Sequence, residues 1–215
     1  MKMTGAIFDM DGTLLDSMYI WEHVAENYLK EQGITPPEDI EAEVRTFSYF
    51  QTAVHFINRL GLKQTPQQVV EGICRMVDRY YEESFQLKEY AREYLDKLQR
   101  ENIKMCILTA SQYDHAIAAL TRLNILQYFD FVMTCDIAGM SKDEPEIYIQ
   151  TLQKLGTDLQ TTIVFEDSLH CIEAAKNAGF LVVGIYDGFS SAHTEAIKAL
   201  CDRFIFSFKE LCSFQ

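Results

Sequence analysis

The chain has 215 residues, of which 48% are hydrophobic and 24% are charged, and its formal net charge at pH 7 is −13. This length allows one large domain or a core with a smaller second domain, and the composition is that of a soluble globular protein. The acidic balance disfavours binding to nucleic acid or to anionic membranes, because such binding depends on Lys and Arg. No apolar run approaches the ~20 residues that span a bilayer, and the N-terminus lacks the pattern of a secretory signal, so we expect a cytoplasmic protein.

The cysteines form no recognisable metal-binding or disulfide pattern. None belongs to a Cys-x-x-Cys pair, and one lies inside an apolar, strand-like run. We therefore expect them to be reduced and mostly buried, and we expect neither a zinc site nor a disulfide framework. They are Cys74, Cys106, Cys135, Cys171, Cys201 and Cys212.

A short apolar run at residues 5–9 predicts a buried strand, and it leads into two carboxylates one residue apart, Asp9 and Asp11. Residues two apart in an extended chain point to the same side, so we expect these carboxylates to converge where the strand ends. Converging carboxylates repel each other unless a cation or a proton lies between them. Mg²⁺ suits such oxygen ligands, and a carboxylate beside Mg²⁺ can attack phosphorus.

Residues 16–86 have the periodicity of helices and no convincing strand. Apolar residues after Trp21 recur at spacings of three and four, which predicts an amphipathic helix that ends near Gly33. Further helices are predicted from about Pro37, over 47–60 and over about 66–85. We therefore predict a small helical domain at 16–86, inserted into a core domain made of residues 1–15 and 87–215.

Predicted helices and strands alternate in the rest of the chain. The strands are expected at 104–108, 129–134, 161–167, 181–185 and 204–206, and the helices at 90–101, 114–123, 145–155, 172–178 and 194–200. This alternation predicts βαβ units and an α/β fold with a mainly parallel, Rossmann-like sheet. Ligands of such sheets bind outside the carboxyl ends of the strands. Asp9, Thr109, Glu166 and Asp167 lie at predicted strand ends, so we expect them to gather at one edge.

Three of these later segments carry polar residues that suit a phosphate site. Thr109 offers a hydroxyl at a strand end, followed by backbone N–H groups that turn toward a helix. Lys142 stands in a loop just before a helix whose start is marked by Pro145. Glu166 and Asp167 follow an apolar strand and precede an Ala-rich helix, where they can ligate a metal or favour the helix dipole.

Together these segments resemble the motifs of the haloacid dehalogenase superfamily. Its first motif is Asp-x-Asp-x-Thr after an apolar strand, which residues 9–13 match, and its second is a Ser or Thr that ends the next strand, which Thr109 matches. Its Lys-Pro-x-Pro segment is matched at Lys142 and Pro145, although Asp143 replaces the first Pro. The helical insertion is typical of the subgroup with a helical cap, which includes phosphoglycolate-phosphatase-like enzymes and β-phosphoglucomutase.

The resemblance implies a phosphatase that hydrolyses a small phosphorylated metabolite, a phosphate monoester, through an aspartyl phosphate. Asp9 would attack phosphorus, and Asp11 would protonate the leaving oxygen and then deprotonate a water molecule. Lys142, Thr109 and the backbone N–H of Ala110 would hold the phosphoryl oxygens.

The resemblance also implies Mg²⁺ as the cofactor, held by oxygen ligands. These would be the carboxylates of Asp9 and Asp167, the backbone carbonyl of Asp11 and, through water, Glu166. We expect a monomer whose partner is the phosphorylated metabolite, with no nucleic-acid or membrane partner.

The helical insertion leaves the substrate open. Trp21 and Arg45 are candidates to bind the leaving group of the substrate, and Tyr49, Phe50 and His55 are further candidates. Phosphomutases of this subgroup carry a His where Trp21 stands and a Ser-Arg in the loop that is aromatic here. Both differences argue against a sugar phosphomutase, which is kept as the alternative hypothesis.

Two further hypotheses about the function agree with part of the motif pattern. A metal-independent dehalogenase is disfavoured because its reaction has no leaving oxygen for Asp11 to protonate. A receiver or binding module that is phosphorylated on Asp would use the same acids, hydroxyl and Lys, but the helical insertion and the close Asp-x-Asp pair disfavour it.

Overall fold

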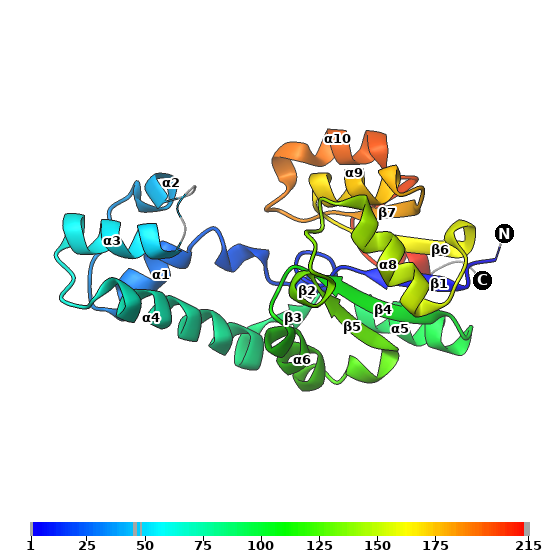
Figure 1. Cartoon of the computed structure of the whole chain (residues 1–215), viewed down its shortest axis with the longest axis horizontal. Coiled ribbons are helices and arrows are strands. Elements are labelled where there is room, and N and C mark those ends of the chain that lie inside the picture. The colour runs from blue at the N-terminus through cyan, green and yellow to red at the C-terminus, as the bar shows by residue number, and fades with distance from the viewer. Residues whose placement is uncertain (1, 45–46, 48, 213–215) are drawn as a thin grey trace. The chain divides into compact units, whose positions relative to one another are not determined.

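The structure of the chain, a computed structural model, describes residues 2–44, 47 and 49–212 (Figure 1). These residues form two compact units. The chain leaves the first unit after Met18 and returns to it after Ser84. We call the first the core unit and the second the helical unit.

One six-stranded sheet forms the centre of the core unit. Its strands are β1 (Gly5–Phe8), β4 (Lys104–Thr109), β5 (Phe131–Thr134), β6 (Thr162–Glu166), β7 (Leu181–Ile185) and β8 (Arg203–Ile205). In space they follow the order β5-β4-β1-β6-β7-β8, and neighbouring strands pair parallel. The predicted α/β fold with a parallel sheet is confirmed. The chain adds β4 and β5 on one side of β1 before it crosses to the other side, which is the topology that places ligand sites at the ends of the central strands.

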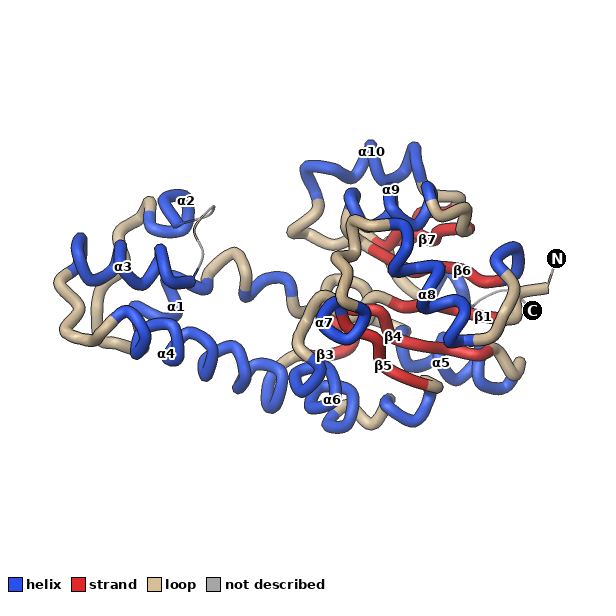
Figure 2. Tube along the Cα trace, viewed as in Figure 1, coloured by secondary structure: helices blue, strands red, loops and turns tan. Residues whose placement is uncertain are grey.

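Helices cover both faces of this sheet (Figures 1 and 2). They are α5 (Ala91–Arg100), α6 (Tyr113–Arg122), α7 (Cys135–Ala138), α8 (Pro145–Leu155), α9 (Leu169–Asn177), α10 (Thr194–Leu200) and α11 (Lys209–Cys212). On one face, α8 contacts β4 and β1, α9 contacts β6 and β7, and α10 contacts β8. On the other face lies α5, with α11 packed against it. Short 3-10 helices occupy Leu126–Tyr128, Leu159–Thr161 and Ser191–His193.

Alternation along β1 supplies a hydrophobic layer to each face of the sheet. Ile7 belongs to the buried cluster beneath α8 and α9, together with Val164 of the paired strand β6. Phe8 points to the opposite face, where its ring stacks on Phe165 with 4.3 Å between ring centroids. Tyr94 of α5 meets both of these rings edge-on. The central strand is thus buried on both faces, as its continuous apolar run predicts.

The helical unit has a hydrophobic core of its own. Its elements are α1 (Val24–Glu31), α2 (Ile40–Val44), α3 (Tyr49–Leu60), α4 (Pro66–Arg79) and a π-helical turn at Tyr80–Ser84, and the 3-10 helix Met18–Ile20 leads into it. Tyr28 of α1 stacks on Phe56 of α3 with 6.2 Å between ring centroids, and Ile73 of α4 is buried in the same cluster. Thr65 begins α4 through a capping box with Gln68.

A short ribbon at the border of the two units is absent from the sequence prediction. β2 (Leu15–Asp16) and β3 (Gln86–Leu87) pair antiparallel, and both belong to the core unit. The helical unit is therefore shorter than the predicted insertion at 16–86. Two-residue strands cannot show the alternation from which a strand is predicted. The single turns α7 and α11 are too short for a helical period and escape prediction for the same reason.

The cysteines and the helices bear on two further expectations. All six cysteines are free, as predicted. Only Cys106 and Cys171 are buried, and the other four are half-buried, so the prediction that most are buried is wrong. Among the helices that the structure describes, none is long and apolar enough to cross a membrane.

Candidate active site

Four of the predicted site residues meet at the carboxyl end of the sheet. Asp9 directly follows β1, Glu166 ends β6 and Asp167 comes next, and Lys142 lies in the loop between α7 and α8. Because β1 and β6 are neighbours in register, the acids that end them lie side by side. Nζ of Lys142 lies 2.6 Å from Oδ1 of Asp9 and 2.6 Å from Oε2 of Glu166. All four side chains are buried.

The three carboxylates form a cluster in which one oxygen atom from each residue lies within 4.8 Å of the others. Oδ2 of Asp9 is buried and has no hydrogen-bond partner among the described residues. Burial, with the charge of Asp9 adding to it, raises the pKa of Glu166 to about 7. Burial and then the charge of Glu166 raise the pKa of Asp167 well above its ordinary value. Three buried carboxylates with an unpartnered oxygen fit a divalent cation, which would favour their ionised forms.

Lys142 remains charged although it is buried. Burial acts to lower the pKa of its amine, but the negative charges of Asp9 and Glu166 outweigh this effect and hold the pKa well above its ordinary value. A fixed positive charge therefore lies between the first and the last of the sequence motifs, where it would attract an anionic phosphoryl group.

The loop that carries Lys142 is held by reciprocal hydrogen bonds. The backbone N–H of Ser141 donates to Oε1 of Glu144 at 2.8 Å, and the N–H of Glu144 donates to the carbonyl of Ser141 at 3.1 Å. Pro145 then begins α8. These bonds fix the loop in which Asp143 replaces the first Pro of the family motif.

Asp167 is oriented by two hydroxyls and by the close approach of a glycine. Oγ1 of Thr13 donates to its Oδ1 at 3.2 Å, and Oγ of Ser190 donates to its Oδ2 at 3.2 Å. Gly12 has a φ of +85° and lies so close that an added Cβ would be 2.6 Å from Oδ2 of Asp167. Only glycine combines this backbone conformation with this approach.

The carboxylate of Asp11 lies outside the cluster of carboxylates. It accepts a hydrogen bond from Oγ of Ser17 at 2.7 Å and another from Oγ of Ser111 at 2.7 Å. The alternation argument, which placed it on the side of Asp9, does not extend this far, because β1 ends at Phe8 and the chain then turns. A carboxylate held by two hydroxyls and partly open to solvent is suited to exchange protons.

Thr109 ends β4 and is buried, as its place in the sequence predicts. Its Oγ1 accepts a hydrogen bond from the backbone N–H of Ser111 at 3.0 Å. This bond shapes the turn after the strand and leaves the hydroxyl proton of Thr109 to donate elsewhere. Ala110, the second predicted phosphate contact in this segment, is exposed at the start of the turn.

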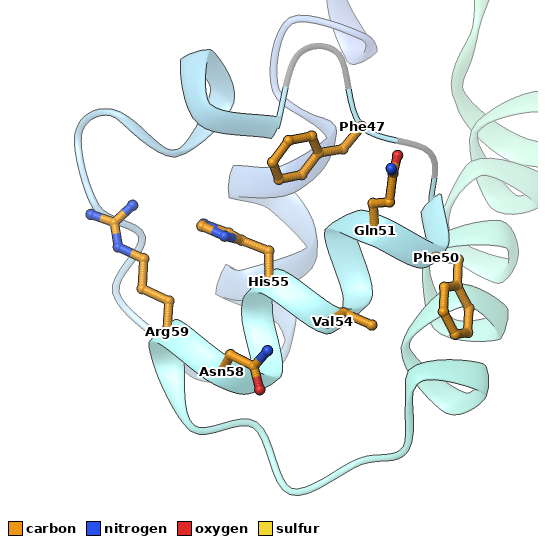
Figure 3. Close-up of a pocket in the computed structure, with 7 residues that line it drawn as sticks. All are labelled: Phe47, Phe50, Gln51, Val54, His55, Asn58 and Arg59. Carbon is orange, nitrogen blue, oxygen red and sulfur yellow. The ribbon is translucent and has the colours of Figure 1, made fainter.

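In the helical unit, a pocket is lined by residues of α3 together with Phe47 (Figure 3). Phe50 and His55, two of the predicted substrate contacts, contribute to it. Nε2 of His55 lies 2.8 Å from Oε2 of Glu43, and the ring of Phe47 meets the imidazole edge-on at 5.7 Å between ring centroids. Figure 3 shows Phe47 beside His55, whereas Phe50 points away from both. Arg45 lies outside the described residues.

Several residues at this edge of the core unit were not singled out from the sequence. Ser17 lies four positions after Thr13, the last residue of the first motif, and Ser111 follows Thr109 by two positions, so a search for hydroxyls near the motifs would have found both. Ser190 carries no such signal, because it lies in a loop far from any motif. The same is true of the ion pair between Lys88 and Asp187, with 2.8 Å between Nζ and Oδ2.

Comparison with known proteins agrees with the fold and identifies the family. A family model described as haloacid dehalogenase-like hydrolase matches residues 6–185. The phosphorylated carbohydrates phosphatase of Thermotoga maritima is 27% identical over 177 residues, 82% of each chain. Hexitol phosphatase B of Escherichia coli is 25% identical over 183 residues, 82% of this chain and 81% of that one.

A solved structure extends the similarity to nearly the whole chain. The crystal structure of a "putative beta-phosphoglucomutase" from Thermotoga maritima has a TM-score of 0.83 and 25% sequence identity, and it covers 98% of this chain and 97% of its own. The family model covers most of this chain as well, including Asp9, Lys142, Glu166 and Asp167. The chain therefore belongs to the haloacid dehalogenase-like hydrolases, as its motifs predicted.

Proposed function

We propose that the protein is a Mg²⁺-dependent phosphatase that hydrolyses a phosphate monoester of a small metabolite through an aspartyl phosphate. The observation that carries the proposal is the buried Lys142, whose Nζ lies 2.6 Å from both Asp9 and Glu166 beside a third carboxylate, Asp167. The curated relatives are named for phosphatases of phosphorylated carbohydrates and hexitols, which supports a sugar or polyol phosphate as the substrate class.

Asp9 and Asp11 divide the chemistry between them. A carboxylate oxygen of Asp9 forms a bond to phosphorus while the bond to the leaving oxygen breaks, and Asp11 gives that oxygen its proton. Water then attacks the aspartyl phosphate, Asp11 takes the proton from the water, and phosphate and the free carboxylate of Asp9 are restored. One group can act first as acid and then as base because the second step reverses the proton flow.

Lys142 and Thr109 support the reaction by holding the phosphoryl oxygens. Lys142 keeps the carboxylate of Asp9 in place and offsets the charge that gathers around phosphorus, which is the main task of a catalyst for phosphoryl transfer. Asp9, Glu166 and Asp167, with the backbone carbonyl of Asp11, would hold Mg²⁺, whose charge reduces the repulsion between the nucleophile and an anionic substrate.

The proposal also gives the helical unit a role in the reaction. The helical unit would act as a cap that excludes water and contacts the leaving group, with Trp21 and Arg45 as its candidate contacts. The monomeric state, the cytoplasmic location and the absence of nucleic-acid and membrane partners stay predictions of the sequence.

A panel of phosphate monoesters tests the activity directly. Sugar, polyol and glycolate phosphates would be supplied to the purified protein with Mg²⁺ or with a chelator, and release of inorganic phosphate would be measured. We expect hydrolysis that requires the metal. Interconversion of a hexose 1-phosphate in the presence of a bisphosphate activator would instead support the phosphomutase, the alternative favoured by the similarity to the Thermotoga maritima structure. A long-lived phosphoprotein without turnover would support a receiver module.

Asp11→Asn is expected to slow the reaction about 10²–10⁴-fold, the usual contribution of a general acid–base group. Mg²⁺ affinity is expected to stay close to that of the wild type, because the side chain of Asp11 lies outside the carboxylate cluster. Steady-state rates and calorimetric Mg²⁺ titration measure the two effects separately. A variant that loses the metal but keeps its turnover at saturating Mg²⁺ would contradict the role of Asp11.

The pKa of Glu166 predicts how the stabilisation of the folded protein by Mg²⁺ depends on pH. This pKa is raised from 4.5 to about 7 in the folded protein. Between these values the folded protein holds a proton that the unfolded chain has released, so the free energy of unfolding of the metal-free protein falls as pH rises through this window. Mg²⁺ binds the ionised carboxylates. The increase in Tm on adding Mg²⁺ is therefore expected to be larger at about pH 8 than at about pH 5.

Glu166→Gln is the control for this prediction. It removes the titrating group, so the metal-free protein should lose the part of its pH dependence that lies in this window. Thermal unfolding with and without Mg²⁺ makes the comparison, and an equal Mg²⁺ effect at both pH values in the wild type would contradict it.

A further inference from the structure

Lys88 and Asp187 form a largely buried ion pair that no sequence motif contains. Nζ of Lys88 lies 2.8 Å from Oδ2 of Asp187, and the two side chains are 15% and 6% exposed. The same Nζ donates a hydrogen bond to the carbonyl of Tyr186 at 2.7 Å. Lys is seldom buried without a structural or functional reason, so the surroundings of this pair are informative.

On the Lys88 side, the pair is anchored to the turn that follows β1. The backbone N–H of Lys88 donates to the carbonyl of Leu14 at 2.8 Å. The preceding strand β3 pairs with β2, with Leu87 opposite Leu15. Lys88 is thereby fixed to the turn of residues 10–15, which includes Thr13, a hydrogen-bond donor to Asp167.

On the Asp187 side, the pair is anchored to the loop after β7. Oδ1 of Asp187 accepts a hydrogen bond from the backbone N–H of Phe189 at 2.9 Å, which shapes the loop of residues 186–190. The next residue, Ser190, donates from Oγ to Oδ2 of Asp167 at 3.2 Å. The two hydroxyls that orient Asp167 therefore come from two separate segments, and Lys88 joins those segments to each other.

We propose that Lys88 and Asp187 are a positioning pair that clamps the loop 186–190 against the turn 10–15 and so aims Asp167 at the metal. The inference rests on the Mg²⁺ site of the proposed function. Groups behind a metal ligand fix its orientation, and their loss typically weakens metal binding by about 10–100-fold. Lys88 and Asp187 act on the ligand through Thr13 and Ser190, so we expect an effect at the lower end of this range.

The direction in which Lys88→Met changes the affinity for Mg²⁺ distinguishes a positioning role of Lys88 from a simple effect of its charge. Lys88 carries a positive charge, and removal of a positive charge near a cation site strengthens cation binding when nothing else changes. Loss of the positioning pair weakens Mg²⁺ binding instead, because Asp167 is no longer held in place. Lys88→Met therefore has opposite expected effects under the two explanations, whereas Asp187→Asn weakens Mg²⁺ binding under both.

Calorimetric titration of Mg²⁺ into the purified full-length chain is the test. We expect the Kd for Mg²⁺ to rise about tenfold in Lys88→Met and in Asp187→Asn. The double variant should bind Mg²⁺ no more weakly than Asp187→Asn, because the two residues act as one unit. Lys88→Arg should bind Mg²⁺ more tightly than Lys88→Met. Lys176→Met is the matched control, since Lys176 also pairs with an aspartate, Asp202, at 2.6 Å, but at the start of β7, the opposite end of the sheet.

The outcomes are distinguishable. Unchanged or tighter Mg²⁺ binding by Lys88→Met, or two single effects that add up in the double variant, would overturn the positioning role while the proposed function stands. A wild-type protein that binds no Mg²⁺ would overturn the metal site of the proposed function itself. Should Lys88→Met fail to fold, judged by circular dichroism, Lys88→Gln takes its place with the same criterion.

Discussion

Asp9→Asn is expected to reduce the rate of phosphate release by a factor on the order of 10⁴ or more, the scale seen when an enzyme loses its nucleophile. The amide nitrogen that replaces one carboxylate oxygen removes the charge with which Asp9 would attack phosphorus. The fold should survive, because Lys142 keeps Glu166 as its partner at 2.6 Å and one source of repulsion among the buried carboxylates is removed. Steady-state phosphate release, measured beside thermal unfolding, checks both statements.

Asp16→Asn is the control for this variant. Asp16 lies a few residues further along the chain, on β2, and its side chain is exposed. Its replacement should leave the rate near that of the wild type. Near-normal turnover by Asp9→Asn would exclude the aspartyl-phosphate mechanism, and an equal loss in both variants would point to a nonspecific effect of the lost charge.

Lys142→Met is expected to be the most destabilising of the substitutions considered. Its side chain is 5% exposed and contacts two buried carboxylates. Removal of one partner from a buried ion pair typically costs about 3–5 kcal/mol in the free energy of unfolding, because a charge is left buried without compensation. Turnover should also fall, by about 10²–10³-fold, since the preorganised positive charge at the phosphoryl group is lost. Urea denaturation and phosphate release measure the two effects.

Excess Mg²⁺ should recover part of the stability of Lys142→Met, because the cation compensates the same carboxylates, but it should not restore turnover. Lys176→Met again serves as the control: its partner Asp202 is 39% exposed, and pairs this accessible to water contribute only about 0–1 kcal/mol. A Lys142→Met protein with the stability and the rate of the control would show that the cluster does not depend on Lys142.

Four features of the site could be predicted from the sequence because each depends on residues close together in the chain. The apolar run before Asp9 makes a strand that is buried on both faces, and the runs before Thr109 and Glu166 make two more. A parallel sheet then brings all three strand ends to one edge, wherever the intervening helices lie. Pro145, at the start of α8, marks where the loop with Lys142 ends. The local patterns, with their resemblance to the motifs of the family, thus pointed to Asp9, Lys142, Glu166 and Asp167, which lie together in the structure.

Other features depended on how distant segments pack. Alternation along a strand predicted that Asp11 would join Asp9, but the chain turns after Phe8, and the carboxylate instead meets the hydroxyls of Ser17 and Ser111. The ribbon of β2 and β3 likewise escaped prediction, because two residues are too few to carry a period.

By itself, the sequence determined the α/β fold, the strand-end acids and the family, since these are written in short apolar runs and in motifs of a few residues. Only the tertiary structure decided which hydroxyls orient Asp167 and which ion pair stands behind them. Ser190 lies 23 positions from Asp167 in the sequence, and Lys88 lies 98 positions from Tyr186, whose carbonyl it contacts. Contacts between residues so far apart in the sequence form only when strands and loops pack together, so no local pattern of residues encodes them.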